Sequence, residues 1–260
     1  MDEQTWLTSD DPAAMLQIVS GKAGMRRDLP SEPGHVLSGY QFCVRSDRKL
    51  WLFSCAAGHV LARDPKNFAN LTRGEATQFI ALFEALADGY SLPESDLIHR
   101  NKGSYLLGTV ESAARHIVSL RDYSEWPHLL RDIFGNPFRP SSLCGVTEGI
   151  THYEAVPECR FCQELLSWHD GLIPRLARTI YEERRFEDMP QLADALGEAG
   201  CENEDMLMHC RGMRQCVGCL RKKAFDCVCR GTGWLPMDKF PAIGPHARGC
   251  WVLDLLLGKE

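Results

Sequence analysis

Apolar residues recur at intervals of three and four along much of the chain, which is the spacing of one face of a helix. The clearest example begins at Thr72 and Glu75, which have capping-box spacing, and stops at Gly89. Similar signals predict further helices over residues 12–20, 46–62, 109–121, 125–134, 173–181, 188–199 and 203–209. We therefore expect a mainly α, irregular multi-helix fold.

Three stretches do not follow this pattern clearly. Residues 22–45 are rich in glycine, proline and polar residues and predict a loop, with Gly21 ending the helix before it. Residues 135–171 are the least regular part of the chain. The closing sequence WVLDLLLG is apolar enough for a buried helix or a strand, and the helix is the preferred interpretation.

Composition limits the classes of protein that fit. With 260 residues, 44% hydrophobic and 25% charged, the chain can bury a core as one large or two modest domains. The formal net charge of −6 provides no overall basic field for nucleic acid or acidic membranes. The sequence has no run approaching the roughly 20 apolar residues that span a bilayer, and its acidic start is unlike a signal peptide. We expect a cytoplasmic protein without a membrane partner.

Four of the twelve cysteines stand within one short segment, CVGCLRKKAFDCVC. In a reducing compartment such clustered thiols bind metal more often than they form disulfides. Zn²⁺ favours four tetrahedral thiolates, and closely paired cysteines allow two short turns to hold it. The spacing predicts a zinc site formed by Cys216, Cys219, Cys227 and Cys229. The alternative is a reduced, flexible loop with incidental cysteines.

Several motifs are similar to those of an uncharacterised family of bacterial, largely planctomycete, hypothetical proteins. They are LRDIFGNPFRP, ending at Pro140, a segment ending in HCRG at 209–212, and GPHARGCWVLDLLLGKE at 244–260. The resemblance implies no activity. In that family the HCRG and GPHxRGCW motifs run almost directly together, which implies that Met213 to Ile243 is an insertion here.

The resemblance gives a predicted domain organisation. We expect a helical N-terminal region over 1–125, a helical C-terminal region over 126–212 plus 244–260, and an inserted zinc knuckle over 213–243. Such an insert of about 31 residues cannot build a sufficient core, and structural zinc contributes on the order of 10–16 kcal/mol in apparent terms. CVCRGTGW at 227–234 also resembles half of the cysteine-rich zinc repeat of J-proteins, with C-x-C in place of C-x-x-C.

A second C-x-x-C pair, Cys159 and Cys162, lies in the irregular stretch. Together with Cys144 and either His152 or His169 it would form a second zinc site. One alternative is that these cysteines are incidental. Redox catalysis is a third and less favoured one, because a thioredoxin-like role would require a βαβ setting that the surrounding pattern does not provide.

The residues His209, Cys210, His246 and Cys250 flank the predicted insert. If the two ends of the insert meet, these side chains converge either as soft metal ligands or as a reactive Cys–His pair. The alternative is a structural role, because buried cysteine and hydrogen-bonded histidine are usually structural.

The insert is also basic, and Phe225 and Trp234 could stack on nucleic-acid bases. The candidate nucleic-acid contacts are Arg214, Arg221, Lys222, Lys223, Arg230 and Trp234. Acidic residues over 182–205 could instead neutralise this patch.

The leading hypothesis is a non-enzymatic, zinc-stabilised helical protein that presents a metal knuckle to another protein. Catalytic motifs are missing from the sequence, so an enzyme is the less favoured class. The first alternative is a nucleic-acid-binding accessory protein, and the second is a Cys/His-dependent enzyme or redox protein.

Overall fold

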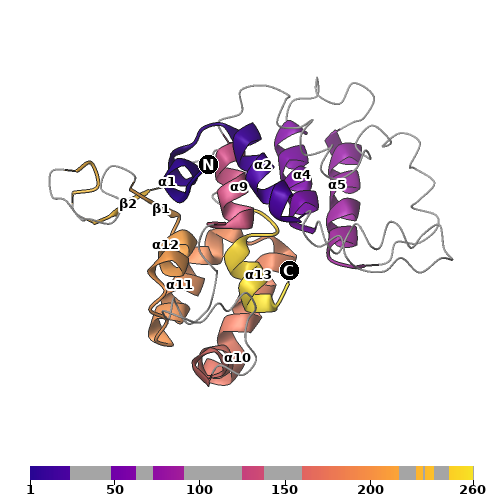
Figure 1. The fold of residues 1–260 in the computed structure, drawn as a ribbon. Helices are drawn as coiled ribbons and strands as arrows, with labels where there is room; N and C mark the ends of the chain where they lie inside the picture. Colours follow the sequence, from indigo (N-terminus) through magenta and orange to yellow (C-terminus); the bar gives the residue numbers. More distant parts are fainter. Residues whose placement is uncertain are drawn as a thin grey trace, which may run out of the picture. The chain divides into compact units, whose positions relative to one another are not determined.

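A computed structural model describes residues 1–23, 48–62, 73–90, 125–137, 160–216, 227–230, 232–236 and 246–259 (Figure 1). Across these residues the protein is mainly helical, which confirms the predicted fold class. The predicted helix over 109–121 and the cap at Thr72 lie outside the described residues, and so does the predicted loop over 22–45 apart from residues 22 and 23, which belong to α2 (Pro12–Ala23). Among the described helices, none is both long and apolar enough to cross a membrane.

The chain divides into two compact units, each considered by itself. The N-terminal unit is Asp10–Phe134, and the C-terminal unit combines Met1–Ser9 with Gly135–Lys259. The division falls at Gly135, whereas the sequence placed the boundary at residue 126. Helix α9 (Trp126–Phe134) accounts for the difference, because it packs against α4 (Arg48–Leu61) of the N-terminal unit.

The N-terminal unit also contains α2 (Pro12–Ala23) and α5 (Arg73–Ala87). Helix α4 packs against α5 and α9, and α2 packs against α9. The ring of Phe53 meets that of Trp126 edge-on at 6.5 Å between centroids. Helix α2 begins where Asp11 Oδ1 accepts hydrogen bonds from the Ala13 and Ala14 amides. It continues to Ala23, so the prediction that Gly21 ends it was wrong: a single glycine weakens a helix without necessarily stopping it.

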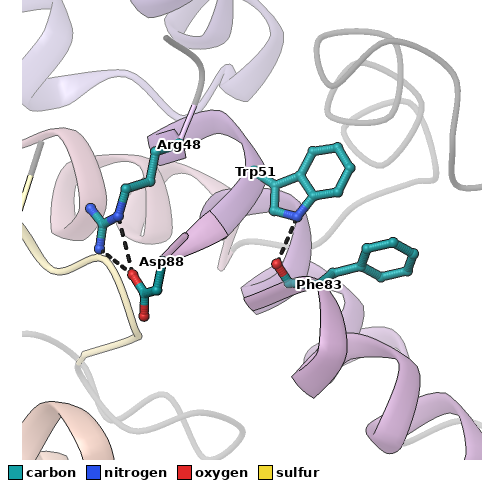
Figure 2. Close-up of polar contacts among 4 residues, drawn as sticks. All are labelled: Arg48, Trp51, Phe83 and Asp88. Atoms are coloured by element: carbon teal, nitrogen blue, oxygen red, sulfur yellow. Dashed lines mark hydrogen bonds and ion pairs between the residues drawn. The ribbon is translucent and has the colours of Figure 1, made fainter. Parts of the chain in front are cut away.

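Two polar contacts join α4 to α5 and the residue that follows it (Figure 2). The Arg48 guanidinium donates from Nε and Nη2 to Asp88 Oδ1 at 3.2 and 2.9 Å. Both side chains are buried, with 7% and 0% of their surfaces exposed. Trp51 Nε1 donates to the Phe83 carbonyl at 2.8 Å, and the two rings meet edge-on at 5.5 Å. The α4–α5 pair is therefore fixed by directional contacts as well as by apolar packing.

The described residues of the C-terminal unit form several helices and one small hairpin. The elements are α1 (Glu3–Thr8), α10 (Arg160–Glu183), η4 (Phe186–Asp188), α11 (Met189–Glu198), α12 (Glu204–Cys210), β1 (Met213–Gln215), β2 (Trp234–Pro236) and α13 (Trp251–Leu257). Helix α10 packs against α11 and α13, and α12 packs against α11, β1 and α13. Their apolar faces share one core that includes Ile180, Leu192, Met206 and Leu253.

Sequence signals at several ends of these helices are confirmed. Asn203 caps α12 by accepting a hydrogen bond from the Met206 amide at 3.1 Å. The closing apolar run forms helix α13, the preferred interpretation, and Gly258 ends it in the left-handed conformation. Helix α1 was not predicted, and neither was the hairpin.

The prediction that residues 135–171 are irregular was wrong for their last part. Helix α10 starts at Arg160, and the helical pattern is hidden by a break at Trp168–Gly171. His169, Asp170 and Gly171 all have positive φ there, so the apolar stripe changes direction between the two halves. A periodicity search across such a break finds only the second half.

Gly135 occupies a position that requires glycine. Its φ is +63°, and a Cβ placed on it would lie 3.1 Å from Trp251 Cγ. Its carbonyl also accepts a hydrogen bond from Trp6 Nε1 at 3.2 Å. This one residue therefore brings the indoles of α1 and α13 against the same short turn.

We predict that Gly135→Ala lowers the free energy of unfolding by about 2–4 kcal/mol, because backbone strain and overpacking add together. Gly258→Ala is a matched control: it has the same φ of +63° but nothing within 4 Å of the added Cβ. The control should cost only about 1–2 kcal/mol. Urea unfolding of the two variants measures the difference. Equal losses of unfolding free energy would show that crowding against Trp251 adds nothing to the cost of the substitution.

Candidate metal centres

Three of the four clustered cysteines converge in the C-terminal unit. One sulfur each from Cys216, Cys227 and Cys229 lies within 4.8 Å of the others, and such a group could hold a metal ion. Cys216 and Cys229 are buried and Cys227 is half-buried. Cys219 lies outside the described residues, so its predicted part in the cluster remains a prediction.

The hairpin explains how residues so far apart in sequence meet. Strands β1 and β2 pair antiparallel, with Met213 opposite Pro236 and Gln215 opposite Trp234. The Cys216 amide donates to the Gly233 carbonyl at 2.8 Å, which extends the pairing by one residue. Cys216 therefore leaves the hairpin next to the turn that carries Cys227 and Cys229.

Backbone hydrogen bonds close that turn tightly. The Arg230 amide donates to the Cys227 carbonyl at 2.7 Å, and the Thr232 amide donates to the Cys229 carbonyl at 3.1 Å. Arg230 and Gly233 have positive φ, at 51° and 81°. The Gly233 amide then donates to Cys229 Sγ at 3.4 Å, an interaction that stabilises the thiolate form of a cysteine.

The spacing of the sulfurs fits a metal better than a disulfide. Cys216 Sγ and Cys227 Sγ lie 3.4 Å apart, far beyond the bonded distance of about 2.05 Å. Four sulfurs at about 2.3 Å from a tetrahedral Zn²⁺ stand roughly 3.8 Å from one another. The one sulfur–sulfur distance of 3.4 Å and the 4.8 Å limit on the others are compatible with ligands of one ion.

The structure describes three of the candidate nucleic-acid contacts, and they differ in exposure. Trp234 is 8% exposed, and its Nε1 donates to Glu204 Oε1 at 3.0 Å, so its ring is used in packing the hairpin on α12. Arg230 is exposed beside the cysteine cluster. Arg214 is half-buried in β1, and Arg221, Lys222 and Lys223 lie outside the described residues.

A second set of soft ligands meets where α12 approaches α13. Cys250 Sγ lies 3.2 Å from His209 Nε2 and 4.0 Å from His246 Nδ1. The two imidazole rings meet edge-on at 4.8 Å, and the His209 ring lies 5.3 Å from that of Trp251. These contacts pack the helix that ends near His209 against the element that contains Trp251.

Other predicted ligands do not join these groups within the described residues. Cys210 is fully buried in the apolar core of the C-terminal unit, next to His209 in sequence but outside the cluster. Cys162 is also buried in that core, on α10. Its predicted co-ligands Cys144, His152 and Cys159 lie outside the described residues. His169 stands at the break in α10 with a φ of 46°.

Sequence reasoning missed the amide of Gly233 as a partner of a ligand sulfur, although the GTG run after Cys229 is typical of a tight turn. It also missed Val228, which is 74% exposed between two candidate ligands. Comparisons with family models, curated proteins and solved structures gave no match for this chain. The fold and the two clusters define a mainly helical protein with groups that could hold a metal.

Proposed function

We propose that this protein is a zinc-stabilised helical protein whose four-cysteine segment presents a small knuckle to another protein. The observation that supports it best is the convergence of Cys216, Cys227 and Cys229 from opposite ends of the segment. Cys219, three residues after Cys216, supplies the fourth thiolate in this proposal. Thiolate ligands and tetrahedral spacing favour zinc over harder ions.

The proposed role of the zinc is structural. Four thiolates fill the coordination shell of Zn²⁺, so they leave no position for substrate or activated water. The hairpin between β1 and β2 has only three residues in each strand, and two-stranded hairpins are marginal in water. Metal binding supplies the folding free energy that such a short element lacks.

Val228 is the reason to propose a protein partner. It is 74% exposed, the most exposed large apolar side chain in the part of the chain that the structure describes. It stands between Cys227 and Cys229, so a metal bound there would hold it rigidly outward. A rigid apolar side chain beside the exposed Arg230 suits a partner surface that is apolar with an acidic rim.

Nucleic-acid binding has less support. A sequence-tolerant single-strand site needs exposed aromatic faces, and Trp234 is buried against Glu204. A reactive Cys–His pair is also less favoured, because Cys250 has no exposed surface through which a substrate could approach.

We predict that a photo-crosslinking amino acid at Val228 traps a discrete partner in the source cells. The same amino acid at Glu182, an exposed residue of α10, is the matched control and should not trap that partner. Adding Cys227→Ala should abolish the adduct at 228, because the turn loses its metal-held geometry. An adduct pattern shared by both positions, or one unaffected by Cys227→Ala, would contradict the proposed interaction surface.

A further inference from the structure

We infer that His209, His246 and Cys250 form a second metal site in the body of the C-terminal unit, separate from the four-cysteine segment. The chemistry of two imidazole nitrogens and one thiolate is that of a divalent transition-metal site, with Zn²⁺ as the expected ion. The inference uses none of the residues on which the proposed knuckle depends, so either can fail alone.

The distances are close to those of shared ligation. Around a tetrahedral Zn²⁺, a nitrogen at about 2.0–2.1 Å and a sulfur at about 2.3 Å stand roughly 3.5 Å apart. Cys250 Sγ lies 3.2 Å from His209 Nε2 and 4.0 Å from His246 Nδ1, on either side of that value. All three donor atoms lie within 4.8 Å of one another.

The three donors stand on two supports, one helix and one turn. His209 stands in the last turn of α12, which Arg211 and Gly212 then close by donating back into the helix. His246 and Cys250 have the H-x3-C spacing that suits two ligands of one ion. A turn between them, with the Cys250 amide donating to the Ala247 carbonyl at 3.0 Å and Gly249 at a φ of 93°, brings both side chains to one side.

Two of the three donors are buried, where a cation shared by several ligands offsets lost hydration well. His246 is 1% exposed and Cys250 is 0% exposed, and the Trp251 ring forms an apolar wall beside His209. Buried polar groups need hydrogen bonds or a metal to offset lost hydration. A single thiol can donate only one proton, whereas one cation satisfies a sulfur and two nitrogen lone pairs together. The geometry therefore favours a cation over a thiol–imidazole hydrogen bond.

The burial of Cys250 also argues against the other possible role of a Cys–His pair, which is nucleophilic catalysis. A nucleophilic cysteine must reach its substrate, and this sulfur is fully enclosed. Ligation needs no such access once the ion is bound. Because ligation joins α12 to α13, the bound ion would link two helices that already pack against each other.

Native mass spectrometry of the full-length, zinc-loaded protein tests the inference by counting metal ions. We expect two zinc ions per chain in the wild type, and one in Cys250→Ala and in His246→Gln. Cys201→Ala is the matched control, because Cys201 is another buried cysteine of the same core and burial raises the pKa of its thiol. The control should retain both ions.

A double variant, Cys227→Ala with Cys229→Ala, removes two of the four knuckle ligands, which leaves too few thiolates there for a stable site and isolates the second site. Loaded with Co²⁺, it should bind one ion with about one quarter of the sulfur-to-metal charge-transfer absorption of a four-thiolate site, since only one thiolate contributes. If Cys250→Ala fails to fold, this double variant and His209→Gln still decide the matter. A folded double variant that binds no Co²⁺, or a Cys250→Ala protein that keeps the wild-type metal count, would overturn the inference.

Discussion

Cys227→Ala in the zinc-loaded protein should unfold the hairpin segment while the helices of both units keep their structure. The segment has few apolar contacts of its own, whereas the helices share an extensive core. Structural zinc contributes on the order of 10–16 kcal/mol in apparent terms, far more than a short hairpin can supply. Loss of one thiolate therefore removes the main source of stability in this segment alone.

Amide hydrogen exchange measures this directly. In the wild type, the amides of Cys216, Thr232 and Gly233 are all bonded around the cysteine cluster. We expect their protection to fall by more than about 100-fold in Cys227→Ala, because local opening then costs little. Cys55→Ala, a buried cysteine of α4, is the control and should leave these amides unchanged. Unchanged protection in Cys227→Ala would mean that the segment is held without a metal.

Asp88→Ala should lower the free energy of unfolding of the N-terminal unit by about 3–5 kcal/mol. The carboxylate is fully buried and faces the Arg48 guanidinium at 2.9 Å. Its removal leaves a buried cation without this counter-charge, which costs more than the pair itself contributes. We expect the α4–α5 pair to lose hydrogen-exchange protection first, because this contact joins the start of α4 to the residue after α5.

Two controls separate the buried charge from a general effect of mutation. The exposed pair Arg211–Asp194 has a similar distance of 3.1 Å, so Asp194→Ala should cost at most about 1 kcal/mol. Replacing both partners, Arg48→Met with Asp88→Leu, should recover most of the loss because no unpaired charge remains. If the double variant loses as much unfolding free energy as Asp88→Ala, the loss would come from altered packing and not from the unpaired charge.

Local signals in the sequence predicted most of the described helices. The Asn203 cap of α12 is one example, because an asparagine side chain can accept a hydrogen bond from an amide of the first turn. The first half of α10 was missed because His169, Asp170 and Gly171 turn the helix and break its periodicity. Short patterns identify such elements only where the backbone stays regular.

The candidate sites were predictable in part. Cysteine spacing identified the cluster, because ligands of one ion are often close in sequence. The burial of Trp234 was not predictable, since its partner Glu204 lies 30 residues earlier in the chain. His209 and Cys250 are 41 residues apart, and only the packing of α12 on α13 brings them together. The sequence identified these residues as candidates, but it did not show which of them lie close together in the fold.

X-ray absorption at the zinc edge of the Cys250→Ala protein tests the proposed zinc site most directly. That variant lacks the thiolate of the second cluster, so its bound zinc reports on the four-cysteine segment. We predict one zinc ion per chain with four sulfur neighbours at about 2.3 Å, which includes Cys219 as the fourth ligand. A first shell that contains nitrogen or oxygen, or a folded protein without stoichiometric zinc, would contradict the proposal.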